Sequence, residues 1–250
     1  MKKNTMSPEK AYEYEIDPDV QTYSYDSIDF APYVMDQVKR TDVADKEIEE
    51  NISGFYRTRG YSLAWIDGKK VNREAKALIR ILGKSNLEGL ERNDYFYQEL
   101  LKKENTVDFF LNSDLVYPQA IVEFDVLLTH AFFQYAFDMY TGKRSPSDVE
   151  HAWKYQPKAT NMGNLLTNAL NNGRVKTSLH NLQPSTIQYG RLKKALKKYR
   201  KMEIKDGVDI PYSALLLQKG DTAFHVRALR EHLLSTGDYK PIWQWKRKNK

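Results

Sequence analysis

The stretch from 118 to 140 constrains the fold more than any other part of the chain, because it is apolar on nearly every side. Its apolar residues do not follow one helical stripe: they are Ile121, Val122, Phe124, Val126, Leu127, Leu128, Phe132, Phe133, Ala136 and Phe137. A helix that is hydrophobic all round is buried within a protein core. The sequence therefore predicts a central helix that other elements cover.

Polar residues on this helix allow two interpretations. Asp125 and Thr129 lie one turn apart on one face, and His130 follows directly. A buried polar group needs hydrogen-bond partners, so this pair can tie the helix to its neighbours. Alternatively, the three residues form a buried acid–base site. The structural interpretation is favoured, because no second carboxylate or nucleophile is visibly placed beside these residues. Asp138, further along the same helix, is also expected to be structural.

Helical spacing of apolar residues predicts most of the other elements. It indicates helices at 34–56, 72–82, 94–101, 161–172, 175–182, from Pro184 onward and at 221–234, and a capping box at 147–150 begins one more. Strand signals are limited to a brief alternation at 61–65 and a β-branched stretch at 208–217. We therefore expect a mainly α fold, an irregular helical bundle with a trace of short β.

Two of these helices carry more detailed predictions. Asn72 is expected to cap a helix, because its side chain can accept from a free N–H of the first turn. The apolar stripe of that helix is Ala75, Leu78, Ile79 and Leu82. In the helix after Pro184, four residues are expected to face inward: Leu192, Ala195, Leu196 and Tyr199. The many Lys and Arg residues between them then face solvent.

The residue inventory excludes several kinds of chemistry. The 250 residues include no cysteine, so the chain supplies neither a thiolate nucleophile nor a metal–thiolate site. The five histidines show no metal-ligand spacing, and no glycine-rich phosphate loop or nucleophile elbow is present. We expect no metal and no cofactor. No stretch approaches the roughly 18 apolar residues of a transmembrane span.

Charge is spread unevenly along the chain. Residues 1–50 hold six Lys and Arg against thirteen Asp and Glu, whereas 186–250 hold sixteen against six. Such asymmetry can indicate a nucleic acid or an anionic surface as partner. Solvated helix faces and tails are the favoured explanation, and the apolar residues among the cations sit at helical spacing. We therefore do not expect a nucleic-acid partner.

Several aromatic residues admit a binding role. Tyr61, Trp65, Tyr95, Tyr97 and Trp153 could form a sugar-stacking surface, because aromatic faces pack on the C–H groups of pyranose rings. Such residues are more often half-buried core. Of these, Tyr61, Trp65, Tyr95 and Trp153 are kept as glycan-contact candidates.

An ordered series of short motifs makes the chain similar to a known family. The series is Phe55-Tyr56, Arg59-Gly60-Tyr61, Leu63, Trp65, Gly89-Leu90, Asp94-Tyr95, Asp125, Leu128-Thr129, Ala131, Tyr135, Asp138, Gly142, Arg144, Trp153, Leu182, Pro184, Tyr189, Leu192, Ala195-Leu196 and Tyr199-Arg200. Over roughly residues 37–203 it resembles the scaffold domain of large, YcbB-type L,D-transpeptidases. A second series, from Lys219-Gly220-Asp221 to Thr236-Gly237-Asp238, looks like the start of a peptidoglycan-binding module.

The resemblance implies a domain plan. We expect an extended or disordered lead-in at 1–33, the helical scaffold domain at 34–210, an incomplete peptidoglycan-binding-like module at 211–238 and a basic tail at 239–250. The complete enzyme forms 3→3 cross-links in peptidoglycan with a catalytic cysteine. No residue here matches that cysteine or its histidine, so no catalytic residue is carried over and the chain itself is not expected to be an enzyme.

The resemblance also implies partners and a location. Peptidoglycan or other cell-wall enzymes are the expected partners, in the periplasm or cell envelope. No signal peptide is recognised in the chain, which leaves a cytoplasmic location open. The resemblance implies either a non-catalytic scaffold part of a transpeptidase or a stand-alone peptidoglycan-associated docking protein. A basic helical nucleic-acid-binding protein, which the charge alone would suggest, is the least favoured function.

Overall fold

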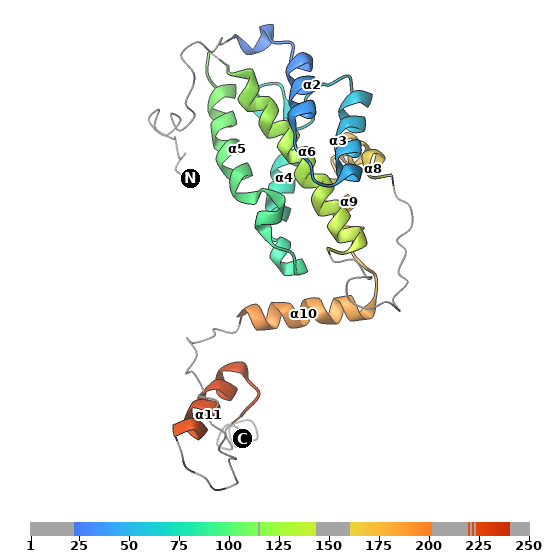
Figure 1. Ribbon diagram of the computed structural model, residues 1–250. Helices are drawn as coiled ribbons and strands as arrows, with labels where there is room; N and C mark the ends of the chain where they lie inside the picture. Colours follow the sequence, from blue (N-terminus) through green and yellow to red (C-terminus); the bar gives the residue numbers. More distant parts are fainter. Residues whose placement is uncertain are drawn as a thin grey trace. The chain divides into compact units, whose positions relative to one another are not determined.

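A computed structural model describes residues 23–114, 116–143, 161–201, 220, 222 and 224–240 (Figure 1). The fold is mainly α, as predicted. Strand structure in these residues is limited to a hairpin of β1 (Ile66–Asp67) and β2 (Lys70–Val71), and to one bridge between Tyr23 and Val116. The chain divides into two compact units, Met1–Ser185 and Thr186–Lys250.

Helix α6 (Pro118–Thr141) is the centre of the first unit, and the prediction of a buried central helix is confirmed. Figure 1 shows α6 between α5 (Tyr97–Leu111) on one side and α2 (Ala31–Arg40) and α3 (Lys46–Thr58) on the other. Helices α4 (Arg73–Leu82) and α8 (Met162–Asn171) also contact it. Sixteen residues of α6 are buried, and the others between Pro118 and Tyr140 are half-buried.

The predicted helix at 34–56 is two helices, which corrects that prediction. Helix α2 ends at Arg40, and α3 begins after Asp45. Asp45 caps α3, because its Oδ1 accepts from the backbone N–H of Glu47 at 2.8 Å and of Ile48 at 3.4 Å. Apolar spacing runs through both helices because both pack on α6, which hides the break between them.

Helix α4 agrees with its prediction in detail. The Asn72 side-chain oxygen accepts from the Ala75 N–H at 2.9 Å, as a capping residue does. All four residues of the expected apolar stripe are buried: Ala75, Leu78, Ile79 and Leu82. The helices predicted at 161–172 and 175–182 are also present, as α8 and as α9 (Val175–His180).

The helix predicted at 94–101 begins and ends elsewhere. Three short 3₁₀ segments, η1 (Tyr25–Ser27), η2 (Ser85–Glu88) and η3 (Arg92–Tyr95), lie outside the α-helices. Phe96, in the left-handed region at φ 55°, separates η3 from α5, and α5 then continues to Leu111. Two predictions, the capping box at 147–150 and the strand at 208–217, fall outside the described residues, as do 1–22 and 241–250.

The second unit contains α10 (Ile187–Lys201) and α11 (Phe224–Thr236). The prediction that Leu192 and Tyr199 face inward is wrong: their exposed fractions are 70% and 60%. Ala195 and Leu196 are half-buried. Helical spacing places apolar residues on one face, but only a neighbouring element can cover that face. None of the helices in the described part of the chain has the length and apolarity needed to span a membrane.

Candidate functional site

A buried network of hydrogen bonds joins α6 to α3 and to the segment before β1. Asp125 and Thr129 of α6 meet Tyr56 of α3 and Trp65 of that segment, and all four residues are fully buried. The Asp125 carboxylate accepts from the Tyr56 hydroxyl at 2.7 Å and from the Trp65 backbone N–H at 2.7 Å. The Ala64 N–H donates to both carboxylate oxygens at 3.0 Å. Asp125 and Thr129 therefore bond α6 to α3 and to the segment before β1.

Two donors of this network are fixed by their chemistry. The Trp65 indole N–H donates to Thr129 Oγ1 at 2.9 Å, and the Tyr56 hydroxyl gives its one proton to Asp125. The one proton of Thr129 has two acceptors within reach, the Tyr56 oxygen at 2.8 Å and the Asp125 backbone oxygen at 3.2 Å. Thr129 therefore joins the Trp65 indole to the other members of the network.

Burial dominates the ionisation of the network. Burial raises the pKa of the Asp125 carboxyl, and its hydrogen bonds from Tyr56, Ala64 and Trp65 oppose that change. Burial and the nearby carboxylate also raise the pKa of Tyr56 well above its usual value. With every Asp125 oxygen occupied by a donor and no exposed surface, a substrate proton cannot reach it. The alternative of an acid–base site is not supported.

His130 does not join the network. It is 7% exposed, and its ring packs against Phe96 with the ring centroids 4.7 Å apart. Burial lowers the pKa of the imidazole, which favours the neutral ring. Because His130 comes one residue after Thr129 on α6, its side chain points in a different direction, toward Phe96.

Asp138 makes a second, smaller tie near the other end of α6. Its Oδ2 accepts from the Tyr95 hydroxyl at 2.8 Å, which joins α6 to η3. The Tyr95 ring meets Tyr135 edge-on, with centroids 5.2 Å apart. Burial raises the pKa of Asp138, and the bond from Tyr95 opposes that change. Asp138 therefore bonds α6 to η3.

The aromatic candidates do not form one exposed surface. Trp65 and Tyr95 are fully buried, because their polar tips bond to α6 and their rings pack in the core. Neither can stack on a sugar in this structure, which corrects that prediction. Tyr61 is half-buried and packs against the core, and Trp153 lies outside the described residues.

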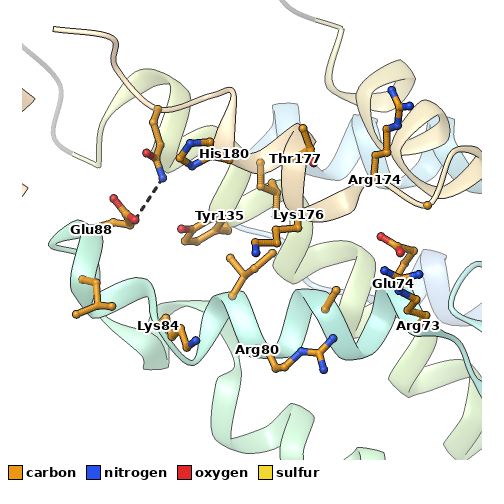
Figure 2. A pocket seen from close by; sticks show the side chains of 16 residues that line it. Arg73, Glu74, Arg80, Lys84, Glu88, Tyr135, Arg174, Lys176, Thr177 and His180 are labelled. Atoms are coloured by element: carbon orange, nitrogen blue, oxygen red, sulfur yellow. Dashed lines mark hydrogen bonds between the residues drawn. The ribbon is translucent and has the colours of Figure 1, made fainter. Parts of the chain in front are cut away.

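A groove of about 570 Å³ lies between α4 and α9, away from the buried network. Figure 2 shows α4, which carries Arg80, opposite α9, which carries Lys176 and His180. Lys84 follows the end of α4, and Tyr135 of α6 lies between Lys84 and His180. Its cationic residues are Arg73, Arg80, Lys84, Arg174 and Lys176, and its carboxylates are Glu74 and Glu88. The groove is therefore lined by five cations against two carboxylates.

The basic groove was missed at the level of sequence. Its cations come from two helices about one hundred residues apart in the chain, which no local pattern connects. One signal was present: Arg73 and Arg80 are seven residues apart, a spacing that places them on one face of α4. No group of three or more side chains suited to hold a metal occurs in the described residues.

Comparison with known proteins gives one match. The family model named Scaffold domain matches residues 50–196, more than half of the 250-residue chain. No curated protein and no solved structure matches this chain. The matched segment runs from α3, through the whole of α6, into α10, and it contains the buried network and the groove. The chain therefore belongs to the Scaffold domain family.

Proposed function

We propose that this chain is a non-catalytic scaffold part of a peptidoglycan L,D-transpeptidase. The observation that carries the proposal is that the family match covers the buried network. Tyr56, Trp65, Asp125 and Thr129 belong to the motif series that resembles these enzymes, and the same residues fix α6 to its neighbours. In this proposal, the residues of that motif series build a rigid support rather than a reaction centre.

The proposed role is orientation. A rigid support can hold separate binding and reacting parts in a productive arrangement around a long polymer, which lowers the entropic cost of bringing them together. The chain has no cysteine, so the thiolate that attacks the donor stem in the complete enzyme must come from another part or another protein. The proposal places this support in the cell envelope, with peptidoglycan and cell-wall enzymes as partners.

Deleting the gene and measuring the cross-links of the cell wall tests this proposal. Muropeptides are digested from isolated sacculi, and 3→3 and 4→3 linked dimers are quantified by mass spectrometry. A selective fall in 3→3 dimers, restored by the gene carried on a plasmid, supports the proposal. Unchanged 3→3 content contradicts it.

The native product should also be weighed. Denatured cell extract is captured with an antibody against residues 187–201, and its intact mass is compared with the 29.2 kDa of this chain. A product about twice as heavy, whose sequence includes a cysteine, supports a scaffold joined to its catalytic domain. A product of 29.2 kDa requires the catalytic part to be a separate protein.

A stand-alone peptidoglycan-associated protein is the second candidate, and the basic groove favours it. A preformed hollow can bind a ligand without any catalytic domain. Purified chain is mixed with isolated sacculi and sedimented over a range of concentrations. Saturable binding, together with 3→3 cross-links that are unchanged by gene deletion, favours this candidate over the first.

A further inference from the structure

We propose that the groove between α4 and α9 binds the free carboxylates of an acidic peptide, and that this peptide is the stem of peptidoglycan. The second half of this inference rests on the proposed function. The groove is separate from the buried network, and the orientation role given to the scaffold makes no use of it. A scaffold with such a groove would also hold one of the reacting stems.

The charges of the groove are not balanced within it. Five cationic side chains line it against two carboxylates. Glu74 is only 9% exposed, and its Oε2 accepts from the Val175 N–H at 2.9 Å, at the beginning of α9. Glu88 accepts from the Gln183 side-chain amide at 3.2 Å. Both carboxylates are thus engaged at the groove walls.

Within the described part of the chain, the five cations form no ion pairs with carboxylates. None of Arg73, Arg80, Lys84, Arg174 and Lys176 comes within 4.0 Å of a carboxylate oxygen in the ion pairs found among the described residues. Glu104 acts on Arg80 only through a longer-range attraction. Gathering like charges around one hollow raises the electrostatic energy of the free protein. An entering anion relieves that repulsion, so the groove favours a ligand with negative charge.

The shape and lining of the groove favour a peptide over a phosphate polymer. Its volume of about 570 Å³ is in the range of small-ligand sites. Apolar side chains of Ile81, Leu87 and Leu179 lie among the cations, and Thr177 and Tyr135 add hydroxyl groups. A phosphate backbone would be followed by an open basic face. A groove that mixes cations with apolar groups fits a short chain that carries both carboxylates and aliphatic carbons.

Arginine and lysine would bind the carboxylates of the peptide in different ways. A guanidinium can donate two parallel N–H bonds to one carboxylate, whereas an ammonium acts as a point charge. Figure 2 shows Arg80 of α4 and Lys176 of α9 on opposite sides of the groove. Carboxylates at two positions along one peptide could thus be held from two helices. This arrangement would fix the direction of the bound peptide as well as its position.

Binding of synthetic peptides to the full chain tests the inference. The probes are a stem tetrapeptide with its free carboxylates and the same peptide with every carboxylate amidated, measured by isothermal titration calorimetry. We expect the amidated form to bind at least about tenfold more weakly, which is a difference of about 1.4 kcal/mol. Equal binding of the two forms, or no binding of the free-carboxylate form, overturns the inference.

Matched variants locate the site. The double variant Arg80→Gln, Lys176→Gln removes two positive charges from the groove, and Lys194→Gln, Lys197→Gln removes two from the exposed face of α10. The groove variant should lose about tenfold in affinity and the α10 variant less than about twofold. Thermal unfolding of both variants confirms that each is folded. An equal loss in both variants means a general charge effect and overturns the assignment.

Two further arms separate the possible failures. If inorganic polyphosphate binds the groove more tightly than the free-carboxylate peptide, and Arg80→Gln, Lys176→Gln abolishes that binding, then the carboxylate assignment is wrong. If gene deletion lowers 3→3 cross-links but the peptide does not bind, this inference fails and the proposed function stands. If the peptide binds but cross-links do not change, the groove binds acidic peptides and the transpeptidase role is wrong.

Discussion

Helices α6 and α10 both contain apolar residues, but neighbouring elements cover those residues only in α6. In α6, Leu128 is fully buried and the polar Asp125 and Thr129 have partners on neighbouring elements. In α10, Leu192 is 70% exposed and cations surround it. The spacing of apolar residues says which side chains share a face. Whether that face is covered depends on elements elsewhere in the chain.

The largest effect is expected from the buried carboxylate of α6. Asp125→Ala should lower the free energy of unfolding by roughly 4 kcal/mol, because two buried N–H donors and the Tyr56 hydroxyl lose their acceptor. Urea unfolding followed by circular dichroism measures the change. The control is Asp36→Ala, which removes only a surface pair with Arg40 and should change stability by less than about 0.5 kcal/mol. Similar losses in both variants would refute the special role of Asp125.

A matched pair of leucine truncations compares the two helices directly. Leu128→Ala should cost about 3 kcal/mol, because it leaves a cavity in the core. Leu192→Ala makes the same chemical change on α10 and should cost less than about 0.5 kcal/mol. Unfolding midpoints in urea give both values. A large cost at Leu192 would mean that another surface covers α10 in solution, and the contrast between the helices would fail.

Thr129→Val is a smaller change within the network of α6. Valine keeps the shape of threonine but removes the acceptor of the Trp65 indole N–H, so a loss of about 2 kcal/mol is expected. The exchange rate of the Trp65 indole proton, measured by NMR, should rise as well. The control Thr141→Val removes an exposed hydroxyl from the same helix, which bonds only to nearby backbone oxygens. Unchanged exchange at Trp65 in Thr129→Val would contradict the hydrogen bond from the Trp65 indole to Thr129.

The smallest effect concerns pH and His130. Burial lowers the pKa of His130 in the folded protein from its usual 6.5, so the unfolded chain binds a proton first as the pH falls. Its contribution to stability is thus present above about pH 6.5 and is lost below it. Comparing wild type with His130→Gln between pH 7.5 and 5 isolates this contribution, because other groups titrate equally in both. Parallel pH curves would show that the imidazole is not buried as described.

Part of this fold could be predicted from sequence because it depends on local chemistry. The burial of α6 follows from apolar residues all round it, and the start of α4 follows from the capping geometry of Asn72. The break at 41–45 was missed because α2 and α3 keep the same apolar spacing across it. Local patterns thus predict that a segment is helical better than they predict the residues at which the helix begins and ends.

The parts that failed depend on long-range contacts. The sequence indicated that Asp125 needed partners, but Tyr56 and Trp65 lie 69 and 60 residues away and carry no local mark. For the same reason, Trp65 and Tyr95 resembled a binding surface until their partners on α6 were known. The basic groove needed two helices to be brought side by side before its charge became visible.

The separation of these partners has a consequence for synthesis on the ribosome. Trp65 emerges 60 residues before Asp125, and ribosomes add roughly 5–20 residues per second. The hydrophobic side chains of α3 and the hairpin would therefore wait roughly 3–12 s for the helix that buries them. Closing a loop of this length also carries an entropic cost that delays pairing. The nascent chain thus passes through a period when it is open to chaperones and proteases, and that period ends with the translation of α6.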